Sequence, residues 1–81
     1  MDSITVYALL FEKGEIYVGM TKNIDRRLAE HRRQQSPSIK RLSGRFELIY
    51  AKTFPGYPEA RSHEKFLKSG RGRLQLRNAR M

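Results

Sequence analysis

The feature that most constrains the fold is a very short turn between two extended stretches of the sequence. Residues 4–11 (ITVYALLF) and 15–19 (EIYVG) are rich in β-branched and aromatic residues, and only Glu12, Lys13 and Gly14 separate them. A three-residue hairpin loop commonly carries its glycine in the left-handed region, so we expect Gly14 to adopt that conformation. The two stretches therefore predict an antiparallel hairpin.

The length of this loop predicts which residues face each other. Leu9 is expected opposite Tyr17, and Tyr7 opposite Gly19. Because strand side chains alternate between faces, Tyr7 and Tyr17 then share one face as diagonal neighbours. Gly19 leaves a gap beside the Tyr7 phenol. A two-residue loop would turn one strand over and break up the apolar pattern of the other face, so we reject it.

The other face of the hairpin is uniformly apolar and needs a helix to cover it. It consists of Ile4, Val6, Ala8, Leu10, Ile16 and Val18. Residues 23–33 (NIDRRLAEHRR) predict a helix with Asn23 as its N-cap. Phe46–Phe54 (FELIYAKTF) predicts a third strand.

A second helix is predicted over residues 59–68 (EARSHEKFLK). Pro58 opens it at a first helical position, and Gly70 is expected to end it. The following residues, 71–81, are either a short third helix or a flexible basic tail.

The order of these elements, ββαβα with a possible third C-terminal helix, predicts the fold class. It is α+β, with a small three-stranded antiparallel sheet flanked by helices. The length of the chain predicts one domain over residues 1–81, with its core at about 4–70.

The charge of the chain indicates a polyanionic partner. The net charge is +9, and the excess is concentrated in residues 21–45 and 61–81, each with a net charge of +6. A basic surface of this kind binds nucleic acid because each neutralised phosphate releases counterions. A merely solubilising basic surface is the alternative.

Other classes are disfavoured by what the sequence lacks. It has no cysteine, so neither a disulfide nor a thiolate zinc site can supplement the core. Its apolar stretches are too short for a membrane span, and its acidic N-terminus does not resemble a signal peptide. We therefore expect a cytoplasmic protein, nucleoid-associated if bacterial, with no membrane partner.

Three helical residues stand out beside the two tyrosines. Arg27 and His31 are four residues apart and project from one side of their helix, next to its apolar stripe. Glu64 falls on the apolar side of the second helix, where a carboxylate needs a partner or a cation. Each has an ordinary alternative: a surface arginine, a structural histidine, and a salt-bridged glutamate. The tyrosines could likewise be half-buried sheet aromatics.

Taken together, these residues resemble the GIY-YIG nuclease family. TVY (residues 5–7) stands at the first triad and YVG (17–19) at the second, with KNIDRRLAEH and EARSHEKFLK as the arginine and glutamate helices. Thr5 departs from the family's first glycine, at a position outside the chemistry. The similarity is greatest to small stand-alone members, related to the catalytic domains of excision-repair and structure-selective endonucleases.

The resemblance implies metal-dependent hydrolysis of DNA phosphodiester bonds, with Tyr7, Tyr17, Arg27, His31 and Glu64 at the catalytic positions. Glu64 would hold one Mg²⁺ or Mn²⁺ ion, and Arg27 would bind the scissile phosphate. Tyr7 is the candidate general base, its phenolate favoured by a nearby cation, although either tyrosine could serve. His31 would orient a phenol or relay a proton.

Further residues complete this expectation. Asn78 is the candidate for an asparagine that the family often has near the C-terminus. Glu30 and Glu59 are expected to point elsewhere on their helices, which disfavours a two-metal mechanism. The basic residues expected to follow the DNA backbone are Lys22, Arg32, Arg33, Lys40, Arg41, Arg45, Lys65, Lys68, Arg71 and Arg73.

The expected substrate is DNA, branched, damaged or loosely specific in sequence, in repair or recombination, with any targeting partner unknown. The first alternative is a catalytically inactive nucleic-acid-binding module of the same fold. The second is a basic domain that binds protein or the ribosome, although no RNA-binding aromatic pattern is present.

Overall fold

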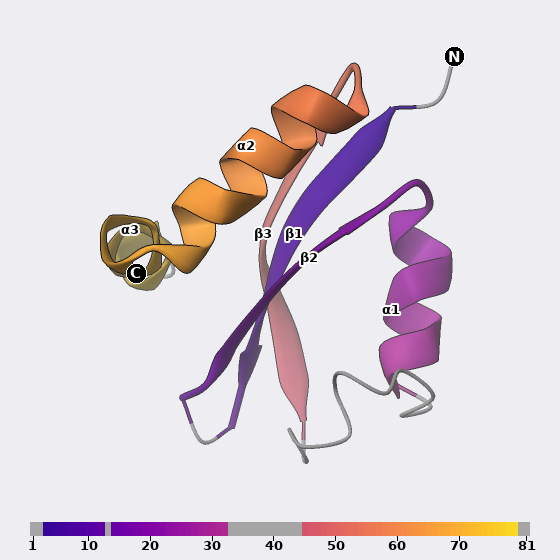
Figure 1. The fold of residues 1–81 in the computed structure, drawn as a ribbon. Coiled ribbons are helices and arrows are strands. Elements are labelled where there is room, and N and C mark those ends of the chain that lie inside the picture. The colour runs from indigo at the N-terminus through magenta and orange to yellow at the C-terminus, as the bar shows by residue number, and fades with distance from the viewer. Residues whose placement is uncertain (1–2, 13, 33–44, 80–81) are drawn as a thin grey trace.

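The computed structural model describes residues 3–12, 14–32 and 45–79. The predicted positions Lys13, Arg33, Lys40 and Arg41 lie outside the described residues. Six elements follow one another along the chain (Figure 1): β1 (Ile4–Phe11), β2 (Ile16–Thr21), α1 (Ile24–Arg32), β3 (Phe46–Phe54), α2 (Tyr57–Lys68) and α3 (Gly70–Ala79). The α+β class and the three-stranded antiparallel sheet are as predicted.

The hairpin has the register that its loop length predicts. Leu9 pairs with Tyr17, and Tyr7 pairs with Gly19. Gly14 has a φ of 91°, and the Phe11 N–H donates to the Glu15 carbonyl at 2.9 Å. The left-handed glycine thus sets the alignment of the two strands, because one residue more or less would turn one strand over.

The sheet separates the molecule into two helical layers. Its strand order is β2-β1-β3, so that β1 is central and β2 has a free edge. Figure 1 shows α1 on one side of the sheet and α2 with α3 on the other. Each side has its own apolar cluster, and both clusters contain residues of β1.

The apolar face predicted for the hairpin is covered by α2 and α3. Its buried residues Ile4, Val6, Ala8 and Val18 pack with Ala60, Leu67 and Leu76 of these helices. The other face carries Tyr7, Leu9 and Phe11, which pack with Leu28 of α1. Residues that alternate along β1 therefore serve opposite layers.

The junction between the last two helices differs from the prediction. The expectation that Gly70 ends the second helix was wrong, because α2 stops at Lys68 and Gly70 begins α3. Ser69 causes the break: its backbone is extended, and its N–H donates to the Phe66 carbonyl at 3.0 Å. Residues 70–79 form a helix, the first of the two alternatives. In the part of the chain that is described, no helix is both long and apolar enough to span a membrane.

Candidate active site

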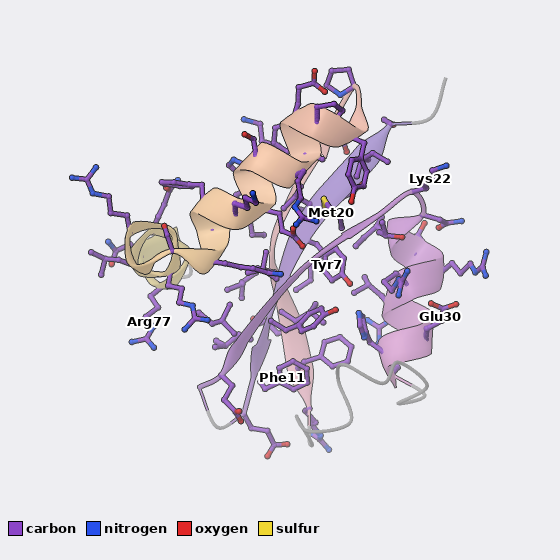
Figure 2. All side chains as sticks on the ribbon, viewed as in Figure 1. Tyr7, Phe11, Met20, Lys22, Glu30 and Arg77 are labelled. Atoms are coloured by element: carbon purple, nitrogen blue, oxygen red, sulfur yellow. The ribbon has the colours of Figure 1, made fainter. Side chains whose placement is uncertain are left out.

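The two hairpin tyrosines lie side by side on the α1 face of the sheet. The ring centroids of Tyr7 and Tyr17 are 6.2 Å apart. Gly19 makes room for them, since a Cβ at this position would lie 2.7 Å from the Tyr7 hydroxyl oxygen and 3.1 Å from Tyr17 Cε1. Figure 2 shows Tyr7 and Phe11 directed towards α1, whereas Met20 lies on the α2 side.

His31 of α1 closes over the tyrosine pair. Its Nε2 is 2.8 Å from the Tyr7 hydroxyl oxygen, within hydrogen-bond distance, and its ring meets the Tyr17 ring edge-on at 5.3 Å. Asn23 positions the helix as predicted, because its Oδ1 accepts the Arg26 backbone N–H at 3.0 Å. Tyr7, Tyr17 and His31 therefore lie together, and Asn23 caps the helix that carries His31.

The histidine is held in its neutral form. Its side chain is 2% exposed. Burial, and then the charge of Arg27, lowers the pKa of His31. Among the described residues, the buried Nδ1 has no hydrogen-bond partner. A neutral imidazole with Nδ1 protonated can accept a hydrogen bond from Tyr7 at Nε2.

Burial of Tyr7 favours its neutral phenol and opposes the effect of a nearby cation, which was expected to favour the phenolate. The residue is 1% exposed, and burial raises the pKa of Tyr7, with the neighbouring Tyr17 adding to the effect. The Arg27 charge acts in the opposite direction, but burial has the larger effect. Tyr17 is only half-buried and is the phenol closer to solvent.

Arg27 lies between an open groove and the cluster formed by Tyr7, Tyr17 and His31. The groove has a volume of about 480 Å³ and is lined by the end of β2 and the first turns of α1 and α2. Arg27 lines it and also acts electrostatically on Tyr7 and His31. Its Nε is 3.6 Å from Glu30 Oε1, and Arg26 Nε is 3.4 Å from Glu30 Oε2. One carboxylate therefore holds two guanidinium groups at the edge of the groove.

Glu30 was predicted to point away from the site, and this prediction was wrong. Its carboxylate contacts Arg27, and its charge raises the pKa of both Tyr7 and His31. The sequence contained the relevant signal, because residues at i, i+3 and i, i+4 on a helix are neighbours. Tyr57, which also lines the groove, was not predicted. It comes from α2, so no spacing in the sequence connects it with α1.

Glu64 is buried as its position on the helix predicted, but in the other layer. It lies between Ala60 and Leu67 on the stripe of α2 that packs against the far face of the sheet. Its Oε2 is 3.3 Å from Lys68 Nζ, and its Oε1 is 3.9 Å from Arg61 Nε. Since β2 is an edge strand, a ligand shared by Glu64 and the tyrosine cluster would lie across the free edge of β2.

The donor set around Glu64 suits one metal ion. Among residues 3–12, 14–32 and 45–79, no group of three His, Cys, Asp or Glu side chains could hold a metal. A single carboxylate is nevertheless a common protein ligand for Mg²⁺, which keeps waters and takes substrate oxygens. The carboxylate now faces two exposed, flexible cations, which such an ion could replace.

The other predicted residues are spread over both layers. Asn78 is exposed in the last turn of α3, a helix that packs against α2 and β3. Lys22 lines the groove, and the Arg32 guanidinium lies 5.6 Å from the centre of the Phe46 ring. The remaining described basic positions are exposed: Arg45, Lys65, Lys68, Arg71 and Arg73.

We expect the protein to lose stability as the pH falls below about 6.5, the ordinary pKa of histidine. Burial lowers the pKa of His31 and His63, so the unfolded chain binds more protons than the native state in this range. The contribution is fully present above pH 6.5 and is lost as the pH falls through the folded-state pKa. The slope of the free energy of unfolding against pH can reach about 1.4 kcal/mol per pH unit for each histidine.

Urea denaturation at pH 7.5, 6.5 and 5.5 measures this slope. A His31→Gln variant should show a shallower dependence on pH than the parent. A free energy of unfolding that stays level or increases on acidification would contradict the expectation.

Comparisons with known proteins agree with the fold. The model of the GIY-YIG catalytic domain matches residues 3–78. A UPF0213 protein of Nitratidesulfovibrio vulgaris is 38% identical over 63 residues, which is 78% of this chain and 57% of that protein. The chain thus spans a little over half of that relative's length. The solution NMR structure of the UPF0213 protein BH0048 from Bacillus halodurans has a TM-score of 0.59 and 32% identity, covering 94% of this chain and 83% of that chain.

The small antiparallel sheet with its flanking helices is a GIY-YIG type of domain, in which Tyr7, Tyr17 and His31 pack together on one face of the sheet. The matched region includes the elements described above except Ala79, the last residue of α3. The chain belongs to the GIY-YIG family, a family of nucleases.

Proposed function

We propose that this protein is a metal-dependent endonuclease that hydrolyses DNA phosphodiester bonds. The observation that carries the proposal is the convergence of Tyr7, Tyr17 and His31 beside Arg27, which lines an open groove. A chain of proton-carrying groups next to a cation that can bind phosphate suits hydrolysis of a phosphodiester better than simple binding. Membership of a nuclease family supports the same reaction class.

Arg27 is proposed to bind the scissile phosphate. Its guanidinium donates in a planar fork that matches two phosphate oxygens. Negative charge on these oxygens increases as the nucleophile attacks, so a donor already held in position stabilises the transition state more than the ground state. The contact with Glu30 restricts Arg27 before substrate binds.

Burial favours the neutral forms of Tyr7 and His31, so Tyr7 is not expected to accept a proton as a phenolate. A proton relay removes the need for that phenolate. Tyr7 packs beside Tyr17 and lies within hydrogen-bond distance of His31 Nε2. In the proposed step, water attacks phosphorus and gives its proton to the Tyr17 oxygen. Tyr17 passes its own proton to Tyr7, and Tyr7 passes its proton to His31 Nε2. No free phenolate is needed. Burial and the charge of Arg27 oppose the imidazolium formed at His31, whereas the charge of Glu30 favours it.

Glu64 is the residue proposed to hold a divalent ion, Mg²⁺ or Mn²⁺. When bound, the ion would supply Lewis-acid stabilisation of charge on the leaving oxygen. The cations Lys68 and Arg61 compensate the charge of the buried carboxylate in the free protein. The substrate would then cross the edge of β2, with its phosphate on the Arg27 side.

The finer parts of the function are also proposals. The described residues include no motif for reading base sequence, so we propose selectivity for DNA structure or loose specificity, in repair or recombination in the cytoplasm. The exposed cations of α2 and α3 would hold the DNA backbone by charge. Retention of the fold for nucleic-acid binding alone is the alternative, and the test below distinguishes the two.

The test is nicking of supercoiled plasmid and cleavage of branched DNA with Mg²⁺ or Mn²⁺, and with EDTA. We expect cleavage that the chelator abolishes. Glu64→Gln should increase the Mg²⁺ concentration for half-maximal cleavage by about tenfold or more, since 1.4 kcal/mol of lost binding is tenfold in affinity. Glu59→Gln, an exposed position on the same helix, is the matched control and should match the parent.

Two results would count against the enzyme. The first is DNA binding without product under every metal condition, which favours the inactive module. The second is cleavage that persists unchanged in Glu64→Gln and in Tyr7→Phe.

A further inference from the structure

An exposed aromatic side chain lies in the groove that Arg27 lines. Tyr57 is the first residue of α2 and is 56% exposed. It belongs to the layer opposite α1, yet it lines the same groove as Arg26 and Arg27. Exposure of so large an aromatic ring leaves apolar surface in water, whereas a bound flat group would cover it.

The charge of the groove selects the kind of ligand. Its described lining contains the cationic side chains Lys22, Arg26 and Arg27 and one carboxylate, that of Glu30. Because both arginines share this carboxylate, positive charge predominates in the lining. Figure 2 shows Lys22 near the end of β2 and Glu30 on α1. A ligand with both an anionic and a flat aromatic part is complementary to this combination.

The size of the groove limits that ligand to about one nucleotide. Its volume is about 480 Å³ and it is open to solvent. A single nucleotide combines a phosphate for the guanidinium groups with a base whose face can stack on a tyrosine. Every base has such a face, so this mode of binding tolerates any sequence.

We propose that this groove binds the nucleotide next to the scissile phosphate, with its base stacked on Tyr57. The inference rests on the proposed function for the identity of that phosphate. In an intact duplex the faces of the bases are covered by their neighbours, and only an unpaired nucleotide can present its base to Tyr57. The substrate class is therefore DNA with unpaired nucleotides at the cleavage point, such as flaps, forks and single-stranded ends.

The absence of tryptophan makes the stacking directly observable. The chain contains no Trp, so Tyr57→Trp introduces a single fluorophore into the groove. Titration with a single-stranded oligonucleotide in EDTA should quench this fluorescence. A fully paired duplex with blocked ends should quench it little, and an abasic site at the stacked nucleotide should abolish the effect.

Binding measurements on unlabelled variants give the magnitude. Tyr57→Ala should weaken single-strand binding in EDTA by about 5- to 100-fold, the equivalent of about 1–3 kcal/mol for one base–aromatic stack. Tyr57→Phe should bind like the parent because it retains the ring. Phe66→Ala removes an exposed ring outside the groove, 40% exposed on the same helix, and should also bind like the parent.

The outcomes separate this inference from the proposed function. Equal single-strand affinity of Tyr57→Ala and the parent, or an unquenched Tyr57→Trp, would overturn the stacking site whether or not the protein cleaves DNA. Quenching and weakened binding in a protein that never cleaves would support the site while contradicting the endonuclease.

Discussion

Replacing Arg27 by alanine is expected to lower the rate of DNA cleavage by about 100- to 1000-fold, the effect of removing one pre-positioned charged donor from a transition state. Arg27 contacts Glu30 and acts on both Tyr7 and His31, so its charge lies where the groove meets the proposed relay. Single-turnover cleavage of a flap substrate at saturating protein measures the effect without a contribution from binding.

Arg26→Ala is the matched control for this experiment. Arg26 is adjacent in sequence, lines the same groove and contacts the same carboxylate, but its side chain is 77% exposed. We expect weaker DNA binding and a nearly unchanged single-turnover rate. Arg27→Lys should fall between alanine and the parent, because it keeps the charge and loses the planar fork. Equal rate losses in Arg26→Ala and Arg27→Ala would contradict the role of Arg27.

Replacing Gly72 by alanine is expected to cause a large loss of stability. A Cβ at Gly72 would overlap the Phe66 carbonyl oxygen and the Leu67 Cα, which belong to the backbone of α2. Neither atom can rotate away, so α3 must move off α2 and expose Leu76. Overpacking of this kind costs about 3 kcal/mol or more, which lowers the melting temperature by more than about 12 °C in a domain of this size.

Gly70→Ala provides the control for the Gly72 experiment. It adds the same methyl group to the same helix, but nothing lies within 4 Å of its Cβ. We expect a melting temperature equal to that of the parent or slightly higher, since alanine restricts the unfolded chain more than glycine does. Thermal unfolding followed by circular dichroism compares the three proteins. A stable Gly72→Ala variant would show that α3 does not pack as described.

The local part of the site could be predicted from the sequence because its geometry depends on short-range rules. The three-residue loop determines the hairpin register, and the register places Tyr7 and Tyr17 on one face. Arg27 and His31 are four residues apart in the sequence, and helical periodicity places them on the same side of α1. None of these relationships requires knowledge of how distant segments pack.

The rest of the site depends on tertiary packing, which cannot be read from the spacing of residues in the sequence. Tyr57 reaches the groove because α2 crosses the sheet near the end of β2. The pKa of Tyr7 is raised because α1 buries it, an effect larger than that of the nearby cation. The last residue of α2 is Lys68, as predicted, but its end was attributed to Gly70 because glycine is the commonest terminator. Here the hydroxyl and the N–H of Ser69 both donate to the Phe66 carbonyl.

One short segment, residues 7–31, contains Tyr7, Tyr17, Arg27 and His31, whereas Glu64 follows β3 in the sequence. On a ribosome, the hairpin and α1 emerge first, and α2, which carries Glu64, emerges only after the third strand has been made. A nascent chain would thus acquire the means to hold a phosphate well before it acquires the proposed metal ligand. Unfinished chains could associate with nucleic acid near their site of synthesis without being able to cut it.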